Sequence, residues 1–472
     1  MELLSYRTLG TEASLSRRMP ERVLQFGDGN FLRGFVDDFI DQMNEKADFD
    51  SSVVIVPPAS TGKTGRINRQ DGLYQLYLRG RLNGQVVDQR RLIRCISRAL
   101  DVFTQWRELL DFVCSDELRF VISNTTEAGI VYDPACRFDD CPPASFPAKL
   151  TRLLWQRWYA GKPGLILLPC ELIADNGTVL RDTVLRHAAD WALEEDFLHW
   201  LREENRFCNT LVDRIVTGYP AAQAPRLNAE NGYEDALLDT AEPFGLWVLE
   251  GDEALSLPVK FVADHHPYKE QKVRILNGGH TSMVLAAYLA GHNIVRECME
   301  DEAVRAYLEG ALFQEIIPTL SLPREDCEAF ARAVEERFAN PYIDHRLLDI
   351  ALNSVSKWRA RVLPSVTAYL EKRLPVQLTF SFAALCAFYT QDQRSGEPYP
   401  VRDEAAVLEF FAAHAEDTSQ MLITALAAQE NFWGQDLNQL PSFTAAAAAH
   451  LERIRRDGIA AAMDACRKEA AL

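Results

Sequence analysis

The sequence predicts an α/β protein, with an open, doubly wound parallel sheet in the first half and a mostly α-helical second half. Three observations lead to this prediction. Short apolar runs recur in the first half, helical patterns separate them, and after residues 257–271 the pattern becomes helix upon helix. Strands of a parallel sheet are buried on both faces and are therefore continuously apolar. Because 472 residues exceed what one hydrophobic core usually serves, we expect two domains, 1–265 and 266–472.

The predicted strands are apolar, often β-branched runs, which are typical of strands. They are residues 23–26, 53–56, 92–96, 120–122 and 165–168, and the stretch 257–271 contains the last of them. After the first strand, an amphipathic helix is predicted from apolar residues at helical spacing, which are Phe31, Phe35, Phe39, Ile40 and Met43. Strands that alternate with helices in this way are typical of βαβ units.

The second half is a succession of helical patterns that proline and glycine mostly separate. The predicted helices cover residues 281–289, 301–313, 326–338, 347–363, 383–389, 403–413, 418–428 and the Ala-rich stretch 445–449. Alanine has the highest helix propensity, so the Ala-rich stretch is expected to be an ordinary helix.

The composition is that of a globular protein and disfavours several classes of function. A formal net charge of −18 disfavours binding to nucleic acid or to an anionic membrane, although a single pocket can still be basic. No apolar segment is long enough for a transmembrane helix, and the N-terminal residues do not resemble a secretory signal. The ten cysteines include no CxxC pair, so we expect reduced, mostly buried thiols in a cytoplasmic protein.

A glycine-rich turn follows the first predicted strand, with the sequence Gly27-Asp28-Gly29-Asn30-Phe31-Leu32-Arg33-Gly34. In a Rossmann-type domain, such glycines allow a tight turn and bring a pyrophosphate close to a helix N-terminus. The third glycine of the GxGxxG pattern is displaced, because Leu32 takes its place and Gly34 comes two residues later. The candidate cofactor-binding residues are Gly27, Gly29, Asn30, Phe31 and Arg33. The alternative is a strand-to-helix turn that binds no ligand.

The second strand bears on the choice between NAD and NADP. It ends at Val56-Pro57-Pro58, without the acidic residue that usually binds the adenosine ribose of NAD. Basic residues follow in a predicted loop; they are Lys63, Arg66 and Arg69. They either bind a 2′-phosphate or face solvent, so these residues alone do not decide between the two cofactors.

The loop after the strand at 120–122 lies where ligands bind in such sheets, at the carboxyl end of a strand. Its residues Asn124 and Thr125 are candidates for the nicotinamide side of a cofactor. An equally weighted alternative is a helix cap, because a threonine followed by Glu127 is typical of a helix N-terminus.

The segment Lys272-Val-Arg-Ile-Leu-Asn277-Gly-Gly-His280 carries the candidate chemistry. On an α-helix advancing roughly 100° per residue, Asn277 and His280 lie at about 140° and about 80° from Lys272, so one face holds all three. A desolvated lysine acts as a general acid or base, and an asparagine amide stabilises a developing oxyanion. A histidine can orient a hydroxyl group. The alternative is an ordinary helix with polar residues.

The Lys-x4-Asn-x2-His pattern, together with Asn209-Thr-Leu-Val-Asp213-Arg214, resembles the long-chain polyol dehydrogenase family typified by mannitol dehydrogenase. Further segments resemble the uronate branch of that family, among them QFGDGNFLRGFVDDFID, ISNTTEAGI, LPCELIADNG, FCNTLVDRIVTGYP and NPYIDHRLLDIALNSVSKWRARVLPS. They extend from about residue 20 to residue 400, so the resemblance covers both predicted domains. Leu32-Arg33-Gly34-Phe35 also departs from the HRAH-like ending of the polyol branch, as the uronate branch does.

The resemblance implies a metal-independent, NAD-linked reductase with a Rossmann-type N-terminal domain and a helical C-terminal domain. It implies that Lys272 is the general acid or base and that Asn277 and Asn209 polarise the substrate carbonyl. It also implies that His280 binds substrate hydroxyls. Asp213 and Arg214 are expected to contact the cofactor or, more in keeping with their place, to form a structural ion pair.

The segment Asn353-Ser-Val-Ser-Lys357 resembles the substrate-binding segment of the family, so Lys357 is a candidate for the hydroxyls or the carboxylate of a hexuronate. Arg361, one helical turn further on, either shares that role or is a surface residue, and the second is slightly favoured. The expected reaction is the reduction of tagaturonate to altronate in hexuronate catabolism. The alternatives are a fructuronate or polyol substrate in the same family, and a nucleotide-binding protein without catalysis. The sequence does not predict the oligomeric state.

Overall fold

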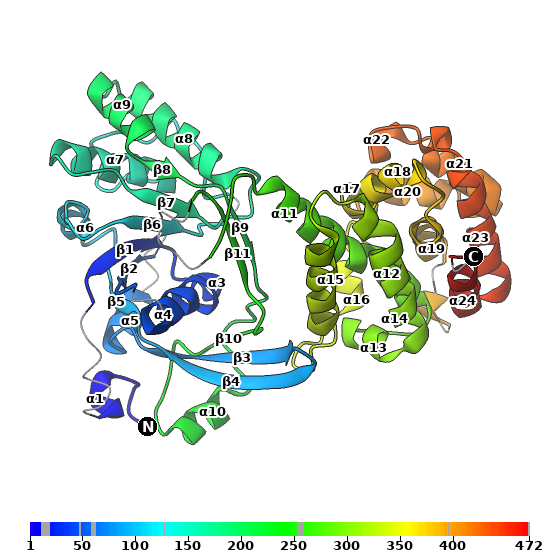
Figure 1. Cartoon of the computed structure of the whole chain (residues 1–472), viewed down its shortest axis with the longest axis horizontal. Helices are drawn as coiled ribbons and strands as arrows, with labels where there is room; N and C mark the ends of the chain where they lie inside the picture. The colour runs from blue at the N-terminus through cyan, green and yellow to red at the C-terminus, as the bar shows by residue number, and fades with distance from the viewer. Residues whose placement is uncertain are drawn as a thin grey trace. The chain divides into compact units, whose positions relative to one another are not determined.

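The computed structural model describes residues 1–10, 19–46, 49–57, 63–126, 128–252, 259–391, 393–394 and 396–470. The described chain divides into two compact units (Figure 1). The first unit comprises Met1–Arg79 and Val87–His265, and the second comprises Gly80–Val86 and His266–Leu472.

The first unit is built on a parallel sheet, which has six strands within the described residues. In sheet order the strands are β5 (Ile96–Ala99), β2 (Ser52–Val56), β1 (Glu21–Phe26), β6 (Phe120–Ser123), β7 (Ile166–Pro169) and β8 (Arg206–Phe207). The chain proceeds from β1 toward one edge through β2 and β5, and then from β6 toward the other edge. The point between β1 and β6 is therefore the topological switch point, where ligands bind in doubly wound sheets. The predicted fold class is confirmed.

Side chains alternate between the two faces of this sheet, and helices cover both faces. Leu24, Val54 and Val121 pack on one face beneath four helices, which are α6 (Trp106–Phe112), α7 (Phe146–Tyr159), α8 (Asn176–Asp190) and α9 (Glu195–Glu203). Val23 and Val53 pack on the other face with α3 (Asn30–Gly34), α4 (Val36–Lys46) and α5 (Lys63–Arg69). Figure 1 shows α7, α8 and α9 above the sheet and α4 and α5 below it. Burial on both faces explains why the strands are continuously apolar.

The predicted strand at 92–96 is wrong, because the backbone leaves one strand and enters another within it. The strand β4 (Gln85–Ile93) ends just before Arg94, whose N–H donates to the Asp41 carboxylate over 2.8 Å. The Asp41 carboxylate thus accepts the hydrogen bond that the carbonyl of a neighbouring strand would otherwise accept. Strand β5 then begins at Ile96.

The amphipathic helix predicted after β1 is broken into α3 and α4 at Phe35, where φ is −128° and ψ is −76°. The carbonyls at the break are satisfied from outside the helix. The Tyr74 hydroxyl donates to the carbonyl of Arg33 over 2.7 Å, and the Arg214 guanidinium donates to that of Gly34 over 2.8 Å. The loop predicted around Lys63, Arg66 and Arg69 is also wrong, because the backbone there forms helix α5; the Lys63 side chain lies outside the described residues.

Smaller sheets and short helices complete the first unit. One sheet contains β10 (Asp239–Ala241), β3 (Tyr74–Leu82) and β4, and another contains β12 (Lys260–Val262), β11 (Leu246–Glu250) and β9 (Thr210–Asp213). The short helices are α1 (Tyr6–Leu9) and α10 (Ala224–Asn231).

The second unit is a helical assembly around α19 (Val376–Thr390), which is buried along most of its length. Its first half contains α11 (His266–Gln271), η2 (Lys272–Asn277), α12 (Gly278–Leu289), α13 (Val295–Glu300), α14 (Glu302–Glu309), η3 (Gly310–Ile316), η4 (Ile317–Thr319) and α15 (Arg324–Phe338). Its second half contains α16 (Leu347–Ile350), α17 (Ser354–Arg361), α18 (Leu363–Leu370), α20 (Ala405–Ala413), α21 (Ser419–Ala427), α22 (Glu430–Trp433), η5 (Leu437–Gln439), α23 (Phe443–Asp457) and α24 (Ile459–Ala470).

Two details of the second half differ from the sequence prediction. The helix predicted over 347–363 is two helices, because Asn353 has a positive φ of 54° and starts α17 afresh. The stretch 257–271 does not contain the last strand, since β13 (Gln393–Arg394) and β14 (Glu397–Pro398) pair later in the chain. The expected helices elsewhere are present, including the Ala-rich one within α23.

All ten cysteines lie in described ranges, and each is a free thiol, as expected. Eight of these thiols are buried, and burial raises the pKa of several of them, such as Cys95. No helix in the described part of the chain has the length and apolar composition that crossing a membrane requires.

Candidate active site

The glycine-rich turn places its glycines in three different environments. Gly27 has a φ of +130°, and a Cβ atom there would lie 2.8 Å from Leu32 Cδ1 and 3.0 Å from the Asn124 carbonyl oxygen. A Cβ on Gly34 would lie 2.7 Å from Val216, so Gly34 permits the close packing usually assigned to the third glycine of the pattern. A Cβ on Gly29 would instead meet open space at the N-terminus of α3. Gly29 therefore leaves the backbone open to a ligand.

Arg33 and Asn30, two further predicted cofactor residues, are bonded to each other. The Arg33 guanidinium donates to Asn30 Oδ1 over 2.7 Å, to the carbonyl of Asp28 and to the carbonyl of Leu237. Its side chain is only 7% exposed. These contacts of the Arg33 side chain hold the glycine-rich turn in one conformation. Phe31, the remaining candidate, is half-buried and stacks on Phe35 at 5.1 Å.

The loop after β6 is held by a buried carboxylate that the sequence analysis missed. Glu171 accepts hydrogen bonds from the Thr125 N–H and hydroxyl, each at 2.9 Å, and from the Ser123 hydroxyl at 3.0 Å. Asn124 donates its amide to the carbonyl of Cys170 over 2.8 Å. Burial raises the pKa of Glu171, although these hydrogen bonds oppose the shift.

The alternative interpretation of this loop as a helix cap is wrong. In the described residues, the next helix after β6 is α7, which begins at Phe146 and is capped by the Ser145 hydroxyl. Glu127, the acidic half of the supposed cap, lies outside the described residues. The loop instead lies beside a cavity at the carboxyl edge of the sheet.

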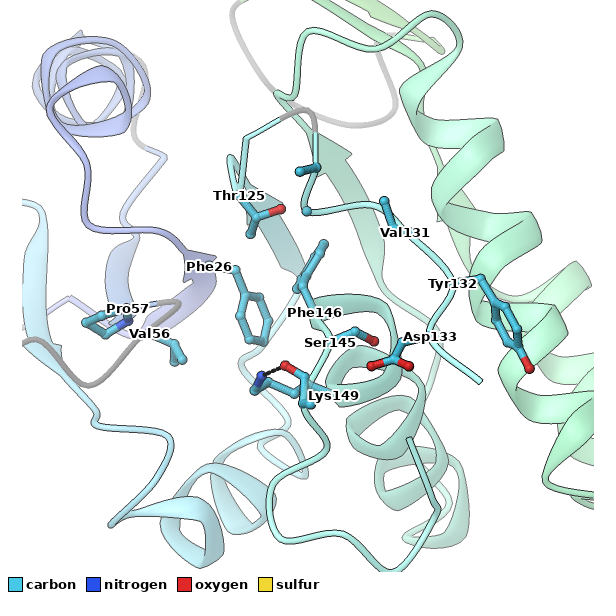
Figure 2. Close-up of a pocket in the computed structure, with 13 residues that line it drawn as sticks. Phe26, Val56, Pro57, Thr125, Val131, Tyr132, Asp133, Ser145, Phe146 and Lys149 are labelled. Atoms are coloured by element: carbon cyan, nitrogen blue, oxygen red, sulfur yellow. Dashed lines mark hydrogen bonds between the residues drawn. The ribbon is translucent and has the colours of Figure 1, made fainter. Parts of the chain in front are cut away.

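This cavity has a volume of about 450 Å³ (Figure 2). Its lining includes Phe26 at the end of β1, Val56 and Pro57 at the end of β2, Thr125, and Phe146 of α7. These are the ends of strands on both sides of the switch point, where a nucleotide binds in this type of sheet. The aromatic and aliphatic side chains of the lining suit a flat, mostly apolar nucleotide base.

The end of β2 contributes no acidic side chain to the cavity, and Pro58 lies outside the described residues. The lining does include the carboxylate of Asp133 and the amine of Lys149. Lys149 donates to the carbonyl of Ala144 over 2.5 Å, and burial lowers the pKa of its amine. A polar contact to the adenosine half of a cofactor is therefore available from these two residues.

The segment with Lys272 and Asn277 is a π-helix rather than the regular α-helix on which the sequence analysis placed it. In a π-helix the backbone N–H of each residue bonds to the carbonyl five residues before it, and such turns occur frequently at functional sites. Lys272 and Asn277 are five residues apart, which is about one π-helical turn. The wider turn brings Asn277 closer to the face of Lys272 than the α-helical spacing predicts.

His280 lies three residues beyond η2, on the first turn of α12, and its ring is enclosed by two others. The Phe338 ring stacks on it with centroids 3.9 Å apart, and the His345 ring meets it edge-on at 5.4 Å. Its Nε2 atom is buried and has no hydrogen-bond partner among the described residues. Burial, followed by the charge of His345, lowers the pKa of His280 well below the usual value. The imidazole is therefore neutral at pH 7.

Lys357 and Arg361 lie on α17, and neither is fully exposed. The Lys357 amine donates to the carbonyl of Ile350 over 2.8 Å, and the Arg361 guanidinium donates to the Thr281 hydroxyl over 3.3 Å. Burial lowers the pKa of both groups. The interpretation of Arg361 as a surface residue is wrong, because its side chain is half-buried and bonds to Thr281, the residue that follows His280.

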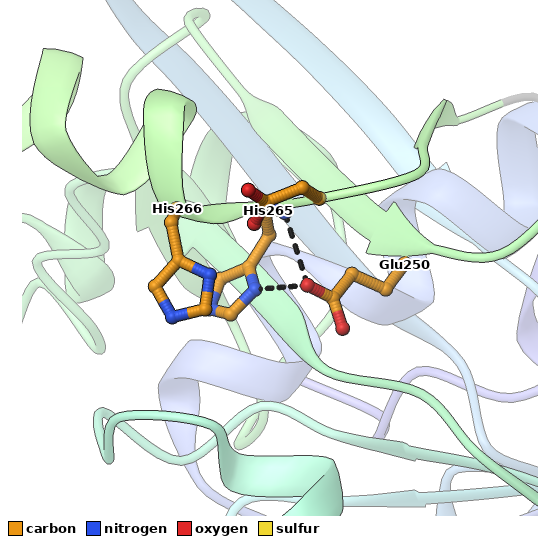
Figure 3. A group of neighbouring side chains, drawn as sticks. Glu250, His265 and His266 are labelled. Atoms are coloured by element: carbon orange, nitrogen blue, oxygen red, sulfur yellow. Dashed lines mark hydrogen bonds and ion pairs between the residues drawn. The ribbon is translucent and has the colours of Figure 1, made fainter.

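Asn209 belongs to the first unit and bonds to Glu250, whose contacts with His265 are drawn in Figure 3. Its amide nitrogen donates to Glu250 over 2.7 Å and to the Thr178 hydroxyl over 3.3 Å, while its Oδ1 atom accepts the Thr178 N–H over 2.9 Å. Glu250 also accepts the backbone N–H of His265 over 3.0 Å and contacts its Nδ1 over 2.6 Å.

Burial opposes ionisation of Glu250, but the hydrogen bonds from His265 and Asn209 outweigh it and lower the pKa of the carboxyl. Glu250, Asp264, His265 and His266 also bring ligand atoms within 4.8 Å of one another, the kind of grouping that binds metal ions. Two of the four, Glu250 and His265, already contact each other. Sequence analysis missed this network because Asn209 and Glu250 are far apart along the chain and no local pattern links them.

Arg214 forms a buried ion pair with Asp38, which lies on α4, at 2.7 Å. Arg214 therefore takes part in a structural ion pair, but its partner Asp38 is not the Asp213 that the sequence analysis had in view. The pair lies directly beneath the turn that contains the glycines, since Arg214 also bonds to the Gly34 carbonyl.

Comparison with known proteins gives matches over nearly the whole chain. Residues 21–259 match the model of the mannitol dehydrogenase Rossmann domain, and residues 264–455 match that of the mannitol dehydrogenase C-terminal domain. Altronate oxidoreductases of Escherichia coli O139:H28 and Klebsiella pneumoniae (strain 342) are each 46% identical, over 96% of this chain and 98% of theirs.

Solved structures give the same result for the fold. A substrate-free D-sorbitol dehydrogenase has a TM-score of 0.82 and 24% identity, over 94% of this chain and 95% of that one. Pseudomonas fluorescens mannitol 2-dehydrogenase, in a ternary complex with NAD and D-mannitol, has a TM-score of 0.68 and 25% identity, over 96% of this chain and 95% of that one.

Proposed function

The chain belongs to the mannitol dehydrogenase family, and from this premise we propose that it is an NAD-dependent oxidoreductase that interconverts tagaturonate and altronate. The observation that carries the proposal is the 46% identity to altronate oxidoreductases over 96% of the chain. The proposed setting is hexuronate catabolism in the cytoplasm, which agrees with ten free thiols.

The first unit has the features needed to hold NAD. Gly29 leaves the start of α3 open for the pyrophosphate, and the bonded pair of Arg33 and Asn30 keeps the turn in shape. The cavity at the ends of β1, β2 and β6 suits the adenosine half, while Asn124 and Thr125 are assigned to the nicotinamide half. Bound NADH supplies the hydride for the reduction.

The second unit supplies the groups proposed to act on the substrate. Lys272 donates the proton that the forming alkoxide requires, and accepts the hydroxyl proton in the reverse direction. The amide of Asn277 donates a hydrogen bond to the same oxygen, where negative charge develops. His280, neutral and held by Phe338, binds a hydroxyl, and Lys357 and Arg361 bind hydroxyls or the carboxylate.

Asn209 is the further proposed catalytic residue. Both of its amide N–H groups are directed at protein acceptors, Glu250 and Thr178. The Thr178 bond is the longer of the two, so the N–H group on that side is the one available to polarise a carbonyl. The other N–H group of the Asn209 amide is hydrogen-bonded to Glu250.

The test is an assay of NADH oxidation by the purified protein with tagaturonate, fructuronate and fructose in parallel, repeated with NADPH. We expect fast turnover with tagaturonate and NADH. Preference for fructuronate or fructose keeps the family and changes the substrate. Absence of turnover with every substrate, from protein that binds NADH, contradicts the proposal and indicates a non-catalytic nucleotide-binding protein.

A further inference from the structure

Cationic side chains gather inside the second unit, although the protein as a whole has a formal net charge of −18. We call them the basic cluster; its members are His280, Arg337, His345, Lys357 and Arg361. The charges of all the others act on His280, and each disfavours its protonation. They come from different elements, because His280 lies on α12, Arg337 on α15, and Lys357 and Arg361 on α17, while His345 precedes α16.

Like charges gathered in a partly buried place repel each other, and an anion bound among them removes the repulsion. Acidic groups also act on the cluster, among them Asp349, toward His345, and Asp403, toward Lys357. Asp403 also accepts the hydroxyl of Tyr389 and the N–H of Val355. Neutral hydroxyls alone do not need such a concentration of positive charge, whereas a carboxylate does.

His345 contacts His280 directly, and the proposed function leaves its role open. The structure shows no hydrogen-bond partner for its ring nitrogens within the described residues, whereas Lys357 and Arg361 each bond to a neighbour. Its backbone is fixed, because its carbonyl accepts the N–H of Val295 over 2.9 Å. Its ring also lies edge-on against His280, so the two imidazoles are direct neighbours.

We propose that His345 is a specificity-determining residue that binds the carboxylate of a sugar-acid substrate, with Arg361 as the cationic group beside it. The inference rests on the proposed function, in which His280 faces the substrate. It explains how a chain of this family selects a uronate over a neutral ketose: the carboxylate pairs with His345, and a neutral hydroxyl in its place gains no such attraction.

Binding of the acid is then coupled to a proton. Burial lowers the pKa of His345, Lys357 lowers it further, and Asp349 opposes the shift, so the free imidazole is neutral at pH 7. A carboxylate in contact stabilises the imidazolium form. The protein therefore takes up a proton from solvent as the substrate binds, and this proton goes to His345.

The test compares His345→Gln with the wild-type protein and with His292→Gln as a matched control. His292 lies in the same unit but pairs with Asp301, at 3.3 Å. We expect kcat/KM for tagaturonate to fall roughly ten- to hundredfold in H345Q, the effect of losing one hydrogen bond to a charged group, with little change for fructose. H292Q should match the wild-type protein for both substrates.

A second measurement does not depend on turnover. Altronate is titrated into the NADH-bound protein by calorimetry in two buffers of different ionisation enthalpy, because this combination cannot react. We expect proton uptake in the wild-type protein and in H292Q, and none in H345Q. His345→Asn serves as a second variant if H345Q does not fold, as judged by circular dichroism.

Equal losses for tagaturonate and fructose, or proton uptake that persists in H345Q, overturn the role of His345 while the proposed function stands. A wild-type protein that reduces no sugar acid removes the proposed function. In that case calorimetry still tests the subsite. Proton uptake on altronate binding that requires His345 supports the role of this residue. Failure of altronate to bind overturns it.

Discussion

Arg214 Nη1 lies 2.7 Å from the Asp38 carboxylate, and the two side chains are 3% and 0% exposed. Asp38 is also held by Arg91, at 2.9 Å, and Arg214 donates to the carbonyl of Gly34 at the broken end of α3. The pair thus joins strand β9 to the helix that follows the glycine-rich turn. Removing one partner would leave a charge buried without compensation.

Asp38→Asn should therefore destabilise the first unit by about 3–5 kcal/mol, the usual cost of breaking a buried ion pair from one side. Urea unfolding followed by tryptophan fluorescence measures the change. The matched control is Glu230→Gln, which breaks the exposed pair of Arg226 and Glu230 and should cost less than about 1 kcal/mol. Equal effects of the two substitutions would contradict the structural role of Arg214 and Asp38.

Lys272→Ala should lower kcat with tagaturonate by roughly 10²–10⁴-fold, because a positioned general acid contributes about that factor. The Kd for NADH, measured by fluorescence, should stay the same, since Lys272 belongs to the second unit and the proposed cofactor groups to the first. Lys468→Ala, an exposed lysine on α24, is the control and should keep full activity. Unchanged turnover in K272A removes Lys272 from the mechanism.

Alanine at Gly27 and alanine at Gly29 should affect different properties, the first stability and the second NADH binding. G27A places a Cβ against Leu32 and Asn124 at a φ of +130°, so it should lower the unfolding midpoint by the equivalent of about 1–3 kcal/mol. G29A meets no protein atom and should fold normally, yet its methyl group should weaken NADH binding tenfold or more. Thermal unfolding and NADH titration separate the two. Tight NADH binding by G29A would mean that the pyrophosphate does not approach this turn.

Glu315 should make the second unit less stable as pH rises. Burial raises the pKa of this carboxyl from 4.5 to about 7, although the N–H groups of Gln377 and Leu378 donate to it. Between these two pKa values the folded state binds more protons than the unfolded state, so the free energy of unfolding falls as pH increases. The contribution is fully present below pH 4.5 and is lost as pH passes 7.

Glu315→Gln removes this dependence and can be compared with the wild-type protein by urea unfolding at pH 5 and pH 8. The difference in stability should shift in favour of E315Q as pH rises. Glu328→Gln, on the surface of α15, should show no such shift. A wild-type protein that gains stability relative to E315Q at the higher pH would show that the carboxylate is favoured in the folded state.

Much of the fold follows from the sequence because its signals are local. The β-branched run at 53–56 and the apolar run at 120–122 become β2 and β6, since a strand buried on both faces needs only apolar residues. The breaks were not predictable in the same way. The chain leaves β4 at Arg94 because the Asp41 carboxylate, far away in sequence, accepts its N–H.

In the candidate site, too, the sequence predicts the residues of a local motif but not those whose partners are distant in the sequence. Lys272, Asn277 and His280 lie within one short segment, and the motif therefore identified them together. Glu171, Glu250 and His345 escaped notice because each acts on a partner that only the folded chain brings near. The π-helical turn also escaped, since its hydrogen bonds depend on packing and not on a residue pattern.

The π-helical turn sets the direction of the side chains that follow it. A π-helical turn holds more residues than an α-helical turn, because each N–H bonds to the carbonyl five residues before it. Every side chain after Asn277 is then rotated by roughly 100° from the position that an uninterrupted α-helix would give it. An α-helical turn over the present sequence would therefore rotate His280 away from Phe338, whereas removing one residue between Lys272 and Asn277 and closing the turn would leave His280 against that ring. The stacking of His280 on Phe338 thus depends on the π-helical turn.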